Sequence, residues 1–270
     1  MKRFWMHTMG VVMSICGTAV LAPACAHDDS SFFLDAVLAP PQGATTGCVF
    51  TSDPTQPSFS FGVLDVAAEA VFANAYYAEF LAGNQLIPQA NQELVMTETS
   101  RIIIQGAVVT ITQADGTAIP GSESPYTAPG AGEVDPSNGG NPGYGPVEFE
   151  IVDASTITAL SKQLALFERE TILTYTKAFG TTLGGDHVES NTFEFPILVC
   201  NGCLIEFDTD TTREPQPNCF GPLPTTSGGQ APCYFGQDVS FDCHACNATS
   251  SVCECGQTTP CTLVAPDAGK

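Results

Sequence analysis

The cysteines of this chain are distributed unevenly, and their distribution divides the sequence into two parts. Nine of the 12 cysteines lie within residues 200–261, whereas residues 26–199 contain only Cys48. Residues 200–261 have too few apolar side chains for a core of ordinary density, so covalent cross-links must replace burial there. We therefore expect a cysteine-poor domain over residues 47–199, a disulfide-rich and loop-rich tail over residues 200–261, and a short end over residues 262–270.

Alternating apolar and polar side chains in the first part are typical of half-buried strands. About seven short strands separated by turn signals favour a mainly β fold, an immunoglobulin-like or fibronectin-III-like β-sandwich. The expected strands cover residues 59–66, 75–87, 98–112, 147–152, 170–179 and 189–199. The alanine-rich stretch 67–82 also fits a helix, and we prefer a strand that begins near Ala75. Asp153 is suited to cap a short helix that ends near Leu166.

Glycine and proline set the expected breaks between these strands. Gly106 interrupts the strongest strand and indicates a bulge or a change of sheet. The Asp115-Gly116 pair indicates a hairpin turn, so residues 117–119 should return beside that strand. Residues 120–146 are rich in Gly, Pro, Ser and Asn and predict a long loop, whose length makes it the expected contact region for a partner.

The first 25 residues have the layout of an export signal, with a basic start, an apolar segment and then small residues. The apolar segment over residues 9–21 is shorter than the roughly 20 residues of a membrane-spanning helix. Residues 21–25, Leu-Ala-Pro-Ala-Cys, are similar to a bacterial lipobox, in which Cys25 becomes the lipid anchor. The alternative is cleavage and release. In both cases residues 26–46 would tether the domain.

An even set of ten cysteines remains once Cys16 in the signal and the anchor Cys25 are set aside. Thiols of an exported chain are oxidised unless they are kept reduced, so we expect all of the remaining cysteines to form disulfides. The predicted disulfide cysteines are Cys48, Cys200, Cys203, Cys219, Cys233, Cys243, Cys246, Cys253, Cys255 and Cys261. Cys48 should pair with Cys200, Cys203 or Cys219, which would tie the first strand of the sandwich to the exit of its last strand.

Two other uses of the tail cysteines stay open. The Cys-x-x-Cys pairs that begin at Cys200 and Cys243 could hold zinc in tetrahedral geometry. The Cys-Asn-Gly-Cys segment that ends at Cys203 could instead be a thiol-disulfide exchange site. Such sites need a helix start after the first cysteine, and residues 204–217 predict no helix. Disulfide formation is therefore the preferred interpretation.

Carboxylates in the loop after Leu204 could supply oxygen ligands to calcium, with Asp208 and Asp210 at the centre of the cluster. Arg213 stands where an EF-hand loop requires glycine, so a solvated acidic loop is the preferred interpretation. The predicted set of metal ligands is therefore empty, and we expect no cofactor.

Charge excludes several functions. Without the signal, the chain has 6 Lys and Arg against 29 Asp and Glu, a formal charge of −23. Such a surface repels phosphate backbones and anionic lipid headgroups, so nucleic-acid binding is excluded and membrane contact is limited to a lipid anchor. The chain also contains none of the GxSxG, HExxH, GxGxxG or phosphate-loop patterns. We expect no enzymatic activity and no catalytic residues.

Four features together resemble the uncharacterised cysteine-rich surface lipoproteins of myxobacteria and related bacteria. They are the lipobox-like start, the acidic sandwich, the strand FPILVCNGCL at residues 195–204 and the tail APCYFGQDVSFDCHAC at residues 231–246. The resemblance implies an outer-membrane anchor through Cys25 and display of the acidic domain in the periplasm or at the cell surface. The expected function is structural or binding, with a protein or a surface polymer as partner, and metal binding is the alternative.

Overall fold

The computed structural model describes residues 31–40, 48–68, 75–89, 97–206 and 233–242. The chain is mainly β. Its elements are β1 (Phe32–Leu38), β2 (Ser58–Phe59), β3 (Gly62–Asp65), β4 (Tyr76–Asn84), β5 (Ile102–Gln113), β6 (Tyr126–Val134), β7 (Gly143–Val152), α2 (Ala154–Gln163), β8 (Arg169–Thr182), β9 (His187–Glu189), β10 (Phe193–Cys200), β11 (Ile205–Glu206) and β12 (Phe241–Asp242).

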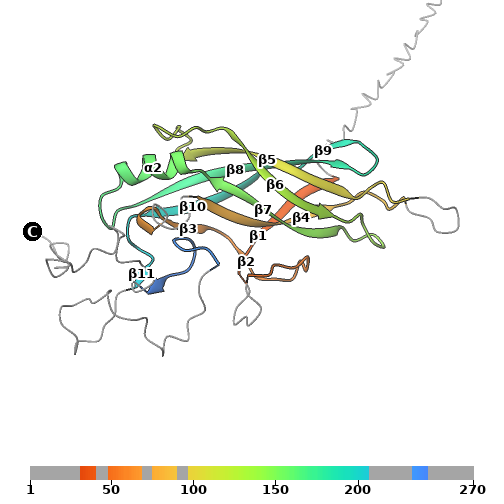
Figure 1. Cartoon of the computed structure of the whole chain (residues 1–270), viewed down its shortest axis with the longest axis horizontal. Coiled ribbons are helices and arrows are strands. Elements are labelled where there is room, and N and C mark those ends of the chain that lie inside the picture. Colours follow the sequence, from red (N-terminus) through yellow and green to blue (C-terminus); the bar gives the residue numbers. More distant parts are fainter. Residues whose placement is uncertain (1–30, 41–47, 69–74, 90–96, 207–232, 243–270) are drawn as a thin grey trace, which may run out of the picture.

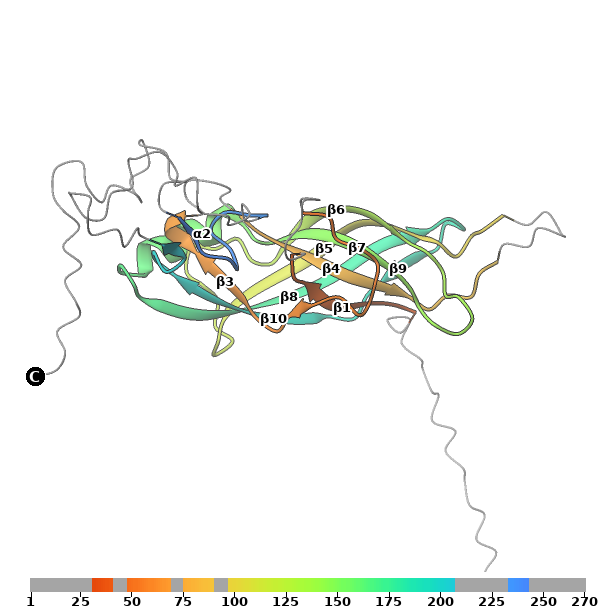
Figure 2. The same cartoon turned by 90° about the horizontal axis from the view of Figure 1, so that it is seen from below.

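Two sheets form the body of the molecule (Figure 1, Figure 2). The first has the order β2-β1-β4-β7, and the second has the order β3-β10-β8-β5-β6, with β9 paired to β8. Most neighbours are antiparallel, but β3 runs parallel to β10. Buried side chains of both sheets form one hydrophobic core, in which Phe80 of the first sheet and Phe195 of the second are almost fully buried.

Most of the strands that side-chain alternation predicts are present in the structure. β10 buries Phe195, Ile197 and Val199 and leaves the intervening side chains partly open, as its period of two requires. The predicted bulge is confirmed, because the register of β5 shifts between Ile104 and Gly106 against both neighbouring strands. The predicted helix cap is also confirmed, since the Asp153 side chain accepts hydrogen bonds from N–H groups of the first turn of α2.

The predicted loop over residues 120–146 is wrong. It contains all of β6 and the start of β7, and β6 rather than residues 117–119 returns beside β5. Gly130 and Gly132 of this stretch serve packing, because the edge strands β6 and β7 approach each other closely. A Cβ atom on Gly132 would lie 2.8 Å from Cγ1 of Val147. Since most of this stretch is not a loop, the length of the predicted loop gives no reason to expect a contact region here.

The expected tether is also partly wrong, because β1 lies within residues 26–46 and pairs with β4. The sandwich thus begins at or before Phe32 rather than at residue 47. The strand expected over residues 59–66 is divided, since β2 joins the first sheet and β3 joins the second. Residues 66–68 begin a helix and β4 begins at Tyr76, so the ambiguous stretch contains both structures.

Candidate functional site

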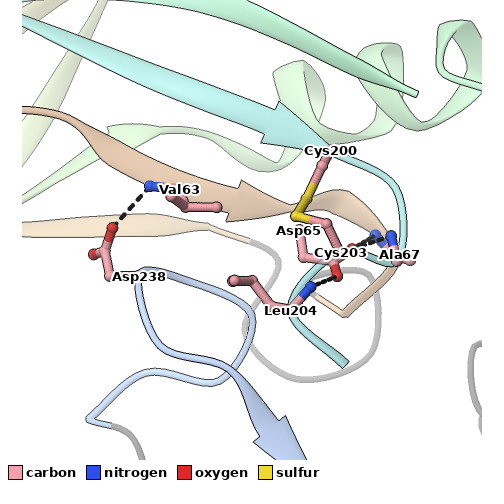
Figure 3. The surroundings of a disulfide bond; sticks show 8 residues. Val63, Asp65, Ala67, Cys200, Cys203, Leu204 and Asp238 are labelled. Carbon is pink, nitrogen blue, oxygen red and sulfur yellow. Dashed lines mark hydrogen bonds between the residues drawn. A yellow bond between two sulfur atoms is a disulfide. The ribbon is translucent and has the colours of Figure 1, made fainter. Parts of the chain in front are cut away.

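The parallel pairing of β3 with β10 determines the position of the Cys-Asn-Gly-Cys turn. Parallel strands end at the same edge of a sheet, and the last residues of these two strands, Asp65 and Cys200, are partners in the register. The turn that follows β10 therefore lies against the carboxyl group of Asp65 (Figure 3).

Asp65 is fully buried, and its carboxyl oxygens accept three backbone hydrogen bonds. Oδ1 accepts from the N–H of Gly202 at 2.7 Å and from that of Ala67 at 3.0 Å. Oδ2 accepts from the N–H of Leu204 at 2.9 Å. A buried carboxyl group without such donors would be destabilising, and here the Gly202 and Leu204 donors belong to the turn that Asp65 holds. Asp65 thus attaches the exit of β10 to the end of β3.

Cys200 and Cys203 form a disulfide across this turn, with Cα atoms 5.9 Å apart. Their sulfur atoms and a carboxyl oxygen of Asp65 lie within 4.8 Å of one another, which is the spacing of a metal-ligand set. The two sulfurs are bonded to each other, however, and both carboxyl oxygens already accept N–H groups. The geometry therefore favours a structural cross-link over a zinc site at this place.

Thiol-disulfide exchange is also disfavoured by the geometry. Reactive cysteines are usually partly exposed and lie where positive charge or a helix start stabilises the thiolate. Cys200 is fully buried, and the chain continues from Cys203 into β11 rather than into a helix. The adjacent Asp65 carboxyl group would repel a thiolate. The Cys200–Cys203 bond consequently has the surroundings of a stable structural disulfide.

Asn201 connects the same turn to the segment between α2 and β8. Its side-chain amide donates to the Leu164 carbonyl at 2.9 Å, and its own carbonyl accepts the N–H of Phe167 at 2.8 Å. Phe167 has a left-handed backbone with φ of 66°, which is uncommon for a bulky residue, and its side chain is about half exposed. The turn thus joins β3, β10 and the chain entering β8.

Residues 233–238, here called the docked segment, lie along the outer edge of β3 (Figure 1). The Asp65 N–H donates to the Gly236 carbonyl at 2.8 Å, and the Asp238 N–H donates to the Val63 carbonyl at 2.9 Å. Farther on, β12 pairs in parallel with β11. The docked segment therefore satisfies backbone groups that an uncovered edge strand would leave without partners.

Gln237 fixes the docked segment to β4. Its side-chain oxygen accepts the Tyr77 N–H at 3.0 Å, and its side-chain nitrogen donates to the Tyr77 carbonyl at 2.7 Å. The Gln237 side chain is buried, so these two bonds replace the water that its amide would otherwise bind.

Asp238 makes the second attachment. Its carboxyl group accepts the Val63 N–H at 2.8 Å and the Tyr76 hydroxyl at 2.8 Å, and its backbone is left-handed with φ of 63°. Burial raises the pKa of Asp238 from 3.8 to about 6, and the bonds from Val63 and Tyr76 oppose that shift. This carboxyl group therefore titrates at mildly acidic pH.

A third contact lies where the docked segment meets β4 and β7. Glu79 and Glu148 are directly opposite each other in the register of these strands. The Tyr234 ring stacks on Tyr77 with centroids 5.7 Å apart, and its hydroxyl donates to a Glu148 carboxyl oxygen. Burial raises the pKa of Glu79 from 4.5 to about 7, and the nearby Glu148 charge adds to the shift.

A disulfide between Cys48 and Cys233 ties the start of the docked segment to the chain before β2. The two cysteines are 185 residues apart in sequence, and their Cα atoms are 5.6 Å apart. The expected pairing of Cys48 with Cys200, Cys203 or Cys219 is therefore wrong. Docking of the tail on β3 and β4 brings Cys233 close to Cys48, and no local pattern in the sequence reveals that docking.

The predicted participation in disulfides is confirmed for Cys48, Cys200, Cys203 and Cys233. The remaining predicted sites lie outside the described residues, namely the anchor Cys25, the disulfide cysteines Cys219, Cys243, Cys246, Cys253, Cys255 and Cys261, and the acidic pair Asp208 and Asp210. Asp65, Gln237 and Asp238 were not predicted, because nothing in one sequence distinguishes them from solvated polar residues.

Among the described residues, no helix has both the length and the apolar character needed to cross a bilayer. Comparison with known proteins found no family model, no curated protein and no solved structure that matches this chain.

Proposed function

We propose that this chain is an exported cell-envelope protein with a structural or binding role, anchored by a lipid on Cys25 and displayed at the outer membrane or the cell surface. The Cys48–Cys233 disulfide carries this proposal. It joins segments far apart in the sequence, and cross-links of this kind persist in oxidising compartments and are rare in the cytosol. A long-range disulfide is therefore expected of an exported chain.

The proposed sandwich type is immunoglobulin-like or fibronectin-III-like. Support comes from the strand order, since β1, β4 and β7 occupy the positions of strands A, B and E in that fold. β10, β8 and β5 then occupy the positions of strands G, F and C in the facing sheet. Domains of this architecture commonly act as binding modules in surface proteins, which agrees with a binding role.

A lipid on Cys25 would orient the domain. Only residues 26–31 separate Cys25 from β1, a span of at most about 20 Å when fully extended. The start of β1 lies near the chain between β9 and β10, since the Leu34 N–H donates to the Asn191 side chain. β9 and β11 lie at opposite ends of the body (Figure 1). The end with β9 would face the membrane, and the end with the docked segment would face away.

The charge of the described surface limits the partner. Arg101 lies 2.7 Å from Asp135, and Lys177 lies 2.6 Å from Glu189, so both cations are neutralised within the chain. An excess of acidic groups disfavours polyanionic partners. The proposed partner is thus a protein or a surface polymer that is not strongly anionic.

The test is the intact mass of the protein isolated from the envelope of a Gram-negative host, before and after alkylation under non-reducing conditions. The expected result is a lipid-modified N-terminal Cys25 and no alkylated thiol, with the Cys25→Ser variant recovered in the soluble fraction. An unlipidated wild-type chain would refute the anchor. Several thiols that react only after treatment with a chelator would refute the complete disulfide set and favour the zinc alternative.

A further inference from the structure

We propose that the docked segment is a pH-operated clasp, which holds the edge of β3 when the Asp238 and Glu79 carboxyl groups are protonated and leaves it when they ionise. The Cys48–Cys233 disulfide would keep the released segment attached to the body. This inference does not depend on a lipid at Cys25.

The geometry makes the docked segment a separable part of the fold. It contacts the edge of β3, the Tyr77 backbone and the hydroxyl of the buried Tyr76, whereas the other side of β3 is hydrogen-bonded to β10 within the sheet. Its release would break these bonds without removing any of the strand pairs within the two sheets. Release would also free the Val63 and Asp65 backbone groups at a sheet edge, and such an edge can pair with another extended backbone.

The groups that face the docked segment are acidic or phenolic. β3 contributes Asp65, β4 contributes Tyr76, Tyr77 and Glu79, and β7 contributes Glu148. Asp35 of β1 acts instead on Tyr144, farther along β7.

None of the described Lys and Arg residues compensates these groups. Arg101 and Lys177 are paired with acids elsewhere, and neither they nor Lys162 and Arg169 contribute to the pKa shifts of Asp238 or Glu79. Ionisation of Asp238 or Glu79 therefore adds negative charge at a contact that lacks a described counterion.

Docking itself causes the burial of Asp238, because Asp238 is part of the docked segment. Its pKa is raised from 3.8 to about 6 in the docked state and returns to its ordinary value on release. A raised carboxyl pKa means that the docked state binds the proton more tightly. The protonated Asp238 therefore contributes fully to the stability of docking below about pH 4. This contribution is lost as the pH rises through about 6.

Glu79 also acts on the docked segment, because its charge contributes to the raised pKa of the Tyr234 hydroxyl. The pKa of Glu79 is raised from 4.5 to about 7, with burial as the larger cause and Glu148 as the smaller. Each unit of difference between docked and released states changes the docking equilibrium tenfold, so Asp238 alone could weaken docking on the order of 100-fold. Partial exposure of Glu79 reduces its share, because water screens the group.

The experiment is amide hydrogen exchange of the oxidised full chain between pH 4.5 and pH 7.5, with rates corrected for the intrinsic pH dependence of exchange. Peptides that cover residues 62–66 and 234–240 report on docking, and peptides from β5 and β8 serve as the internal reference. The expected result is that protection of the first two peptides falls at least tenfold on going to pH 7.5, while the reference peptides keep theirs.

Three variants separate the proposed cause from others. Asp238→Asn keeps the shape of the side chain, and asparagine tolerates a left-handed backbone. Asp238→Asn and Glu79→Gln should each reduce the loss of protection, whereas Glu194→Gln, at an exposed position of β10, should reproduce the wild type.

Several results would overturn the clasp. One is a wild-type docked segment with equal protection at both pH values. Another is a loss of exchange protection in Asp238→Asn that is as large as in the wild type. A third is an equal loss of protection in the reference peptides. Should Asp238→Asn fail to fold, the wild-type titration and Glu79→Gln still decide the matter, since Glu79 lies outside the docked segment.

Discussion

Two regions of this molecule each combine a disulfide with an aspartate that accepts hydrogen bonds from other segments, and they are held in different ways. Beside the turn after β10, Asp65 at the end of β3 accepts three backbone N–H groups next to the Cys200–Cys203 bond. In the docked segment, Asp238 accepts one backbone N–H and the Tyr76 hydroxyl. The first carboxyl group accepts donors from the end of β3 and from the turn after β10, whereas the second is shielded from water by the docking of its own segment. The second attachment is therefore the one that we expect to depend on pH.

The largest expected effect comes from removing the long-range disulfide. The double variant Cys48→Ala/Cys233→Ala no longer closes a loop of 185 residues. We expect the free energy of unfolding to fall by about 5 kcal/mol, because the unfolded chain gains conformational entropy. Urea denaturation of the double variant and the wild type measures this change. A loss no larger than that caused by removing the short-range disulfide would contradict the comparison.

The next effect concerns Asp65. Asp65→Ala leaves the N–H groups of Gly202, Ala67 and Leu204 without their acceptor, and we expect a loss of about 3 kcal/mol in the free energy of unfolding. Asp65→Asn retains one acceptor oxygen and should lose less. Urea denaturation of the two variants provides the comparison. Equal losses would show that the hydrogen bonds of Asp65 do not determine its contribution.

A smaller effect is expected for the short-range disulfide. Cys200→Ala/Cys203→Ala opens a loop between residues only 3 apart, which predicts a loss of about 2 kcal/mol. Since Asp65 still holds the turn in this variant, exchange of the Gly202 and Leu204 amides should remain slow. Fast exchange of these amides at native stability would show that the disulfide, and not Asp65, holds the turn.

The smallest effect concerns the pH dependence of stability near the docked segment. Glu79→Gln removes a carboxyl group whose pKa is raised to about 7, so the stability that the wild type loses through Glu79 between about pH 4.5 and pH 7 is not lost in the variant. We expect the variant to equal the wild type at pH 4 and to exceed it at pH 8 by about 1 kcal/mol, a value reduced for partial exposure. Thermal denaturation at both pH values measures the difference. An equal difference at the two pH values would exclude titration of Glu79 as its cause.

Patterns of neighbouring residues predicted several parts of the fold. The alternation in β10, the bulge at Gly106 and the cap at Asp153 each depend on neighbours in the chain, and the structure confirms each one. Composition misled the interpretation of β6, because Gly130 and Gly132 resemble loop residues although they allow two edge strands to approach. Glycine-rich sequence can therefore indicate either a loop or closely packed strands, and here only the contact between β6 and β7 distinguishes the two.

By itself the sequence determined the mainly β character and the use of Cys48, Cys200, Cys203 and Cys233 as disulfide cysteines. These properties follow from side-chain periodicity and from thiol chemistry, and both are local. The pairing of Cys48 with Cys233 and the position of Asp65 beside Cys200 follow from the three-dimensional arrangement of the strands and the tail. Both contacts require a particular strand order and a docked tail. Such contacts between distant parts of the chain result from burial over the whole molecule, which no local pattern encodes.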